Sequence, residues 1–162
     1  MKPRRKITAA ILLGLCASFG VGFFPAAAQD IGSIDDGVFK SADLNNDGKI
    51  PRREILHFTD LVFLSVDTNN DDVLTVEEFL EWDPGYLFLA EKTGKTAQLN
   101  TAKQEAYKLL DINGDGSLEH DEFSTAALYD FYRADVNSDR ALDQDEFIGE
   151  YRVLKTVRSA LE

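Results

Sequence analysis

Apolar residues recur along the chain in a fixed register around four short polar segments. An aromatic residue lies four positions before each segment, at Phe39, Phe63, Tyr107 and Phe131. An apolar residue follows each segment directly, at Ile55, Phe79, Phe123 and Phe147. One further apolar residue lies inside each segment, at Ile50, Leu74, Leu118 and Leu142. This register predicts helices that lead into and out of each polar segment and bury their apolar faces in one common core.

The four polar segments are copies of one 12-residue repeat and align without a gap. They span residues 43–54, 67–78, 111–122 and 135–146, and we call them loops one to four. Each has Asp at position 1, Asn at position 3, Asp at position 5 and Glu at position 12. A solvated acidic stretch has no reason to keep such spacing, so the repeat predicts a metal site in each loop.

The chemistry of calcium explains this spacing. The ion prefers about six to eight oxygen ligands in a roughly pentagonal bipyramid. Side chains at positions 1, 3 and 5, a backbone carbonyl at position 7 and a bidentate Glu at position 12 can supply them.

On these residues, the chain over residues 38–160 resembles the EF-hand superfamily. The resemblance implies an all-α fold of helix-loop-helix units with four metal loops, Ca²⁺ as the ion, and short β-bridges between paired loops. The implied side-chain ligands are Asp43, Asn45, Asp47 and Glu54; Asp67, Asn69, Asp71 and Glu78; Asp111, Asn113, Asp115 and Glu122; and Asp135, Asn137, Asp139 and Glu146. The implied carbonyl ligands at position 7 belong to Lys49, Val73, Ser117 and Ala141.

The four loops are not expected to bind equally well. Position 6 turns sharply with a positive φ, which Gly48 and Gly116 adopt at little cost. Asp72 tolerates that backbone moderately, whereas Arg140 suits it poorly and brings a positive charge near the ion. Loop three has a further acidic residue, Glu119, at position 9. It therefore combines a high negative charge with glycine at position 6. We rank loop three first and loop one second, and leave loops two and four open.

The gaps between the loops predict which loops pair. Residues 52–66 and 120–134 contain no Gly, Pro or Asn to turn the chain back, so each is expected to be a single helix. A helix of that length spans about 22 Å and holds its two loops at opposite ends. We therefore expect loop two to pair with loop three and loop one with loop four. Leu74 should then lie beside Leu118, and Ile50 beside Leu142.

The N-terminal stretch has the order of a secretory signal. Basic residues at 2–6 precede an apolar run over 7–24 and then Pro25 and three alanines. We expect a signal peptide over residues 1–28, a four-EF-hand domain over 29–162, and a periplasmic or secreted protein. An uncleaved membrane anchor is the alternative, and no membrane contact is expected after cleavage.

Charge narrows the set of partners. The chain carries a formal net charge of −12, and without residues 1–28 it keeps 13 Lys and Arg against 29 Asp and Glu, about −16. Nucleic acids and anionic membranes repel such a surface, so metal ions are the expected partners. The one cysteine also lies within residues 1–28, so ions rather than disulfides would order the fold.

Function follows from these points as an expectation: an exported calcium-binding protein whose ions order the fold, with calcium storage as a further role. Twelve residues separate loop one from loop two, and twelve separate loop three from loop four. This close spacing resembles that of the lanmodulins, which implies a periplasmic lanthanide-binding protein as an alternative. The lanmodulins have proline at loop position 2, where this chain has Leu44, Thr68, Ile112 and Val136. A calcium-dependent regulator with one dedicated protein partner is a further alternative. No enzyme is expected. The carboxylates that could act in acid-base catalysis are already assigned to calcium, and His57 and His120 are the only histidines.

Overall fold

The computed structural model describes residues 30–162, and the predicted signal peptide over 1–28 lies outside the described residues. The helices are α1 Ile31–Ala42, α2 Arg52–Val66, α3 Val76–Glu81, α4 Leu87–Thr93, α5 Thr96–Leu110, α6 His120–Ala134, α7 Gln144–Gly149 and α8 Arg152–Ser159. The strands have two residues each: β1 Ile50–Pro51, β2 Val73–Leu74, β3 Leu118–Glu119 and β4 Ala141–Leu142. None of these helices has the length and apolar character needed to cross a membrane.

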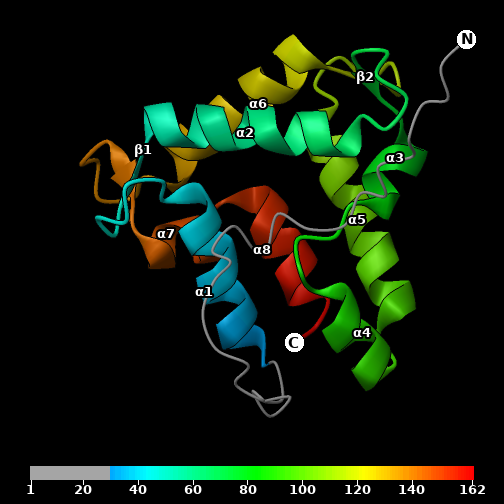
Figure 1. Cartoon of the computed structure of the whole chain (residues 1–162), viewed down its shortest axis with the longest axis horizontal. Helices are drawn as coiled ribbons and strands as arrows, with labels where there is room; N and C mark the ends of the chain where they lie inside the picture. The colour runs from blue at the N-terminus through cyan, green and yellow to red at the C-terminus, as the bar shows by residue number, and fades with distance from the viewer. Residues whose placement is uncertain (1–29) are drawn as a thin grey trace, which may run out of the picture.

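The two long helices α2 and α6 set the layout of the loops. Each is one continuous helix of 15 residues with the bounds that the sequence predicts. They pack against each other and hold one pair of loops at each end (Figure 1).

The loops pair as predicted. Strand β1 pairs antiparallel with β4, which puts Ile50 opposite Leu142. Strand β2 pairs antiparallel with β3, which puts Leu74 opposite Leu118. The all-α EF-hand architecture and both loop pairs are therefore confirmed.

The repeated aromatic residues meet in one core. Phe63, Phe79, Phe131 and Phe147 are almost completely buried. Phe39 packs edge-on against Phe147, with ring centroids 6.2 Å apart. Helices that flank different loops thus share one apolar interior, as the register of aromatics predicts.

The segment between loops two and three contains three helices. Helix α3 leaves loop two, helix α5 leads into loop three, and the short helix α4 lies between them where the chain reverses. The turn before α4 is fixed by Asp83, whose carboxylate accepts the N–H groups of Gly85 and Leu87 at 2.9 and 3.1 Å. Gly94 ends α4 with a φ of 71°.

The C-terminal helix α8 lies in the middle of the molecule (Figure 1). It packs against α5 and α7 and buries Val153, Leu154 and Val157. Val153 and Leu154 also line a small apolar cavity of about 30 Å³, together with Phe58, Phe79 and Phe123. Helix α8 therefore covers the apolar surface that the loop-flanking helices present.

Two arginines fasten α8 to helices that lead into loops. Arg152 Nε donates to Asp130 Oδ1 of α6 at 2.6 Å, and Arg158 Nε donates to Asp35 Oδ2 of α1 at 2.8 Å. The Tyr86 hydroxyl donates to the other oxygen of Asp35 at 2.7 Å. Both aspartates are buried, so each needs its arginine as a counter-charge.

Candidate metal centres

Each loop winds around the carboxylate at its first position. In loop three, Asp111 Oδ1 accepts the N–H of Gly114 at 2.7 Å and Oδ2 accepts that of Gly116 at 3.0 Å. In loop four, Asp135 accepts the N–H groups of Asp139 and Arg140 at 3.1 and 3.0 Å. These bonds hold the loops in a tight turn in which oxygen ligands can face one point.

The predicted positive φ at position 6 is present in all four loops. It is 83° at Gly48, 63° at Asp72, 87° at Gly116 and 72° at Arg140. Asp72 and Arg140 therefore adopt a backbone that suits glycine better.

Position 4 also has a positive φ, which the sequence analysis missed. Its values are 58° at Asn46, 59° at Asn70, 74° at Gly114 and 60° at Ser138. Three of the four residue types carry a signal for it, because Gly and Asn are the residues that most often take the left-handed conformation, whereas Ser138 carries none.

The aspartate at position 5 uses one oxygen for its own loop. In each loop its Oδ1 accepts the N–H of position 7, at distances from 2.9 to 3.1 Å. In loop three, the Ser117 hydroxyl also donates to Asp115 Oδ1 at 2.8 Å. These two bonds from Ser117 lower the pKa of Asp115. Within residues 30–162 the Oδ2 of these aspartates accepts no backbone N–H, so it is the freer of the two oxygens for an ion.

The glutamate at position 12 folds back over the start of its loop. Glu122 Oε1 accepts the N–H of Asn113 at 2.9 Å, and Glu146 Oε1 accepts that of Val136 at 3.0 Å. Glu54 and Glu78 make the corresponding bonds at 3.3 and 3.2 Å. In loop three, the outgoing helix thereby brings the carboxylate of Glu122 close to those of Asp111 and Asp115.

Burial and hydrogen bonding act against each other at Glu78. Burial alone would raise the pKa of this carboxyl group, but bonds from Thr75, Thr68 and Asn69 outweigh it and lower the pKa. Glu78 is therefore held as a carboxylate.

Two residues at position 9 serve as helix caps. Thr75 and Asp143 each accept the N–H of the position-12 glutamate and form a capping box with it. The carboxylate of Asp143 is thus engaged at the start of α7.

Loop three brings its carboxylates closest together. Asp111, Asp115 and Glu122 each place an oxygen within 4.8 Å of the others. Among residues 30–162, this is the one group of three acidic, His or Cys side chains that meets so closely. The donors are all oxygens, which is the set that a hard cation such as Ca²⁺ prefers. This preformed cluster agrees with ranking loop three first.

Loop four has a different arrangement at position 5. The ammonium of Lys49, from loop one, pairs with Asp139 Oδ2 across the β1–β4 bridge. The bond from Lys49 lowers the pKa of Asp139, and the same bond raises the pKa of Lys49. The sequence predicts only a carbonyl ligand from Lys49 and gives no sign of this side-chain contact.

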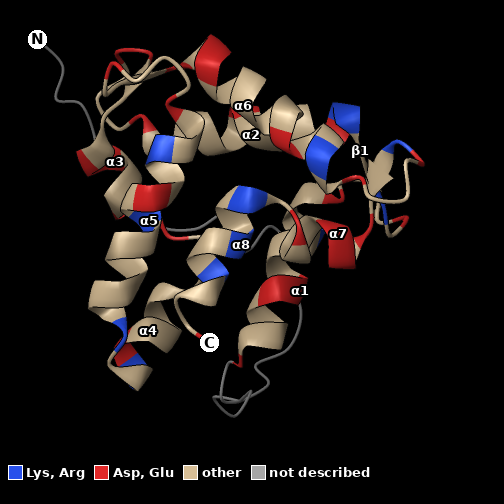
Figure 2. Cartoon of the chain, turned by 180° about the vertical axis from the view of Figure 1, so that it is seen from behind, with Lys and Arg blue, Asp and Glu red and all other residues tan. Residues whose placement is uncertain are grey.

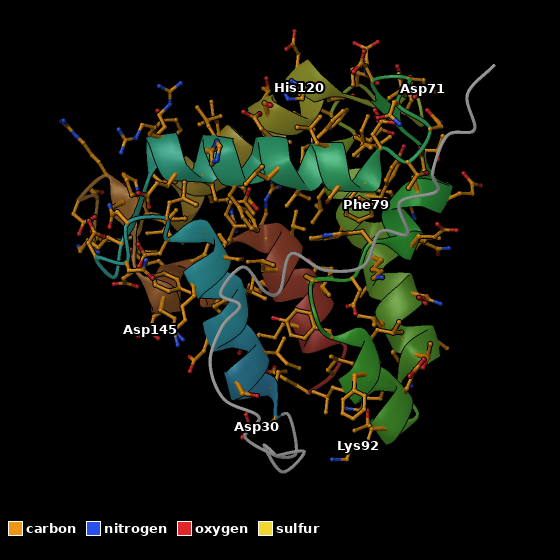
Figure 3. All side chains as sticks on the ribbon, in the orientation of Figure 1. Asp30, Asp71, Phe79, Lys92, His120 and Asp145 are labelled. Carbon is orange, nitrogen blue, oxygen red and sulfur yellow. The ribbon has the colours of Figure 1, made fainter. Side chains whose placement is uncertain are left out.

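The two histidines lie outside the ligand sets. His57 is exposed on α2. His120 Nε2 lies 3.1 Å from Asp60 Oδ1, and its ring packs edge-on against Phe63. Figure 3 shows His120 at the start of α6, close to the paired loops two and three.

A family model described as EF hand matches residues 34–58 and 108–127. The first segment contains loop one, and the second contains loop three with parts of the helices on both sides. These are the two loops with glycine at position 6. No curated protein matches the chain. Four repeated loops, two antiparallel loop pairs and the two matched segments together place the chain in the EF-hand superfamily of calcium-binding proteins.

Proposed function

We propose that the chain is an exported calcium-binding protein whose ions order the fold and which also stores calcium. The ligands in this proposal are the side chains at positions 1, 3, 5 and 12 and the carbonyl at position 7 of all four loops. The observation that carries it is the convergence of Asp111, Asp115 and Glu122 to within 4.8 Å in loop three.

The charge distribution supports a role for ions in ordering the fold. Acidic residues gather at the two ends of the α2–α6 pair, where the loops lie (Figure 2). Without residues 1–28 the chain carries about −16, and four divalent ions would reduce this to about −8. Ion binding would thereby relieve repulsion between carboxylates that the fold holds close together.

Helix α8 favours storage over signalling. A calcium sensor of the calmodulin type binds targets through an apolar groove that opens between its helices. Here the corresponding apolar surface is covered by Val153, Leu154 and Val157 of the chain's own C-terminal helix. A storage protein needs no target-binding groove. Its ions would stabilise the fold without exposing a surface for a partner.

The ion is tested by titrating residues 29–162 with Ca²⁺, Mg²⁺ and La³⁺. Trp82 is a suitable reporter because it ends α3, the helix that leaves loop two, and packs on Phe79 with ring centroids 5.5 Å apart. Calcium should change the Trp82 emission and increase the helical circular dichroism signal, whereas Mg²⁺ at the same concentration should do so weakly. An unchanged signal with calcium would contradict the proposal.

Export is tested separately. The first 28 residues should direct a fused reporter that is active only outside the cytoplasm, and the mature chain should begin at Gln29. An inactive reporter, or an intact N-terminus in the purified protein, would contradict the proposed export.

A lanthanide is the second candidate ion. Its support is the close spacing of the loops that resembles the lanmodulins, which leaves one helix shared by loops one and two and another shared by loops three and four. If La³⁺ displaces Ca²⁺ at micromolar concentration while Ca²⁺ binds only weakly, the lanthanide reading is preferred. The proposal assigns no catalytic role, because the carboxylates of the loops are given to ions.

A further inference from the structure

Lys49 touches two metal loops at once. Its backbone carbonyl stands at position 7 of loop one, while its ammonium pairs with Asp139 at position 5 of loop four. The strand pairing places it there, since Ile50 and Pro51 next to it lie opposite Leu142 and Ala141. The contact therefore follows from how the two loops are joined.

Lys49 pairs with the freer of the two carboxylate oxygens of Asp139. Asp139 Oδ1 already accepts the N–H of Ala141 at 3.0 Å, as its counterparts do in the other loops. Lys49 pairs with the remaining oxygen, Oδ2. The ammonium also interacts with the charges of Asp143 and Glu146, at positions 9 and 12 of the same loop. A positive charge thus faces three of the carboxylates of loop four.

The other loop pair has no such cation at the same position. Position 7 is Val73 in loop two and Ser117 in loop three. Ser117 donates to the aspartate of its own loop and leaves that loop's carboxylates close together. The two pairs of loops therefore differ in charge at one equivalent place.

We propose that Lys49 is a tethered cation that competes with the metal ion for loop four. An ion can bind there only after the ammonium has left Asp139, so loop four fills after loop three and more weakly. The inference rests on the proposed function, because it concerns calcium binding by the same loops. The competing charge comes from loop one, so its effect adds to that of Arg140 at position 6 of loop four itself.

The test follows each loop separately by NMR during a calcium titration at low salt. The amide of Arg140 donates to Asp135 and reports loop four, while that of Gly116 donates to Asp111 and reports loop three. Lys49→Gln should raise the affinity at Arg140 about two- to fivefold, the range expected for an exposed charge pair. The calcium affinity measured at the Gly116 amide should be the same as in the unmodified protein. Lys49→Arg should restore the original affinity at loop four, because it keeps the charge.

Two controls remove the same charge elsewhere. Arg53→Gln removes a charge next to strand β1, and Arg53 forms no ion pair within residues 30–162. Lys92→Gln lies on α4, away from both loop pairs (Figure 3). Both should change the affinity of loop four less than Lys49→Gln does. Added salt should shrink the difference between Lys49→Gln and the unmodified protein.

The outcomes separate this inference from the proposed function. An unchanged affinity at Arg140 in Lys49→Gln, a gain equalled by Arg53→Gln, or a gain that persists in Lys49→Arg would overturn the role of Lys49. If neither Arg140 nor Gly116 responds to calcium in the unmodified protein, the proposed function fails instead.

Discussion

At the scale of single residues, position 6 of each loop decides how much strain the loop carries. Arg140 holds a φ of 72°, a conformation that glycine adopts more easily. Arg140→Gly should stabilise the protein against urea by about 1 kcal/mol and increase calcium affinity at loop four. The reverse change, Gly116→Ala, tests the same cause in loop three.

The reverse change isolates the backbone, because a Cβ at Gly116 would meet nothing within 4 Å. Its cost should therefore arise from the φ of 87° rather than from a clash. If Gly116→Ala leaves the free energy of unfolding unchanged, the strain argument for both loops is wrong.

Position 12 tests the ranking of the loops. Glu122→Gln should reduce calcium affinity more than Glu146→Gln, because loop three has three convergent carboxylates while Asp139 of loop four pairs with Lys49. Calorimetric titration of both variants compares the losses. Equal losses, or a larger loss in Glu146→Gln, would show that the ranking is wrong.

The sequence predicts the proposed ligand positions because the repeat fixes them locally. The contact of Lys49 with Asp139 spans 90 residues and depends on which loops pair, so no local pattern indicates it. The predicted pairing of loops one and four implies that the two residues lie near each other, but it does not indicate that their side chains meet.

At the scale of elements, the long helices were predictable and α8 was not. The bounds of α2 and α6 follow from the absence of turn residues between consecutive loops. Helix α8 carries basic and apolar residues, which predict an amphipathic helix but not the surface it covers. Its partners Asp35 and Asp130 are buried and lie far from α8 in the sequence. Nothing in the residues around them distinguishes them from the exposed aspartates that are the usual case.

The attachment of α8 to α1 should depend on Asp35. Asp35→Ala removes the acceptor of both Arg158 and the fully buried Tyr86, so we expect a loss of about 2 to 4 kcal/mol. Lys155→Ala is the matched control on the same helix, because it breaks the exposed pair with Glu150 and should cost less than about 1 kcal/mol.

Urea unfolding measures both variants, and hydrogen exchange locates the change. Amides of α8 should exchange faster in Asp35→Ala than in Lys155→Ala. Similar unfolding free energies for the two variants would mean that Asp35 does not fasten α8.

At the scale of the whole molecule, two loop pairs lie at opposite ends of a pair of helices about 22 Å long. Each pair concentrates negative charge that calcium would neutralise (Figure 2). The core between them is continuous, since helices flanking all four loops contribute buried aromatics. Stabilisation at either end should therefore reach the same cooperative unit rather than two independent halves.

Removal of the metal should consequently lower the stability of the entire molecule. At a free calcium concentration about tenfold above the dissociation constant, each occupied site contributes about 1.4 kcal/mol. Four sites of that kind would raise the melting temperature by about 15 °C or more over the chelated protein. Thermal melts followed by circular dichroism, with calcium and with chelator, measure the difference, and both should show a single transition.

Salt distinguishes specific binding from simple screening of about −16 of charge. Sodium chloride at about 0.5 M shortens the range of repulsion between carboxylates, so it should raise the melting temperature of the chelated protein. It should recover only part of the difference, because a monovalent salt supplies no ion that the loops can coordinate through several oxygens at once. If salt alone restores the full melting temperature, neutralisation of charge is sufficient and bound calcium does not order the fold. If the chelated protein already melts within a few degrees of the calcium form, α8 and the aromatic core hold the fold together without ions.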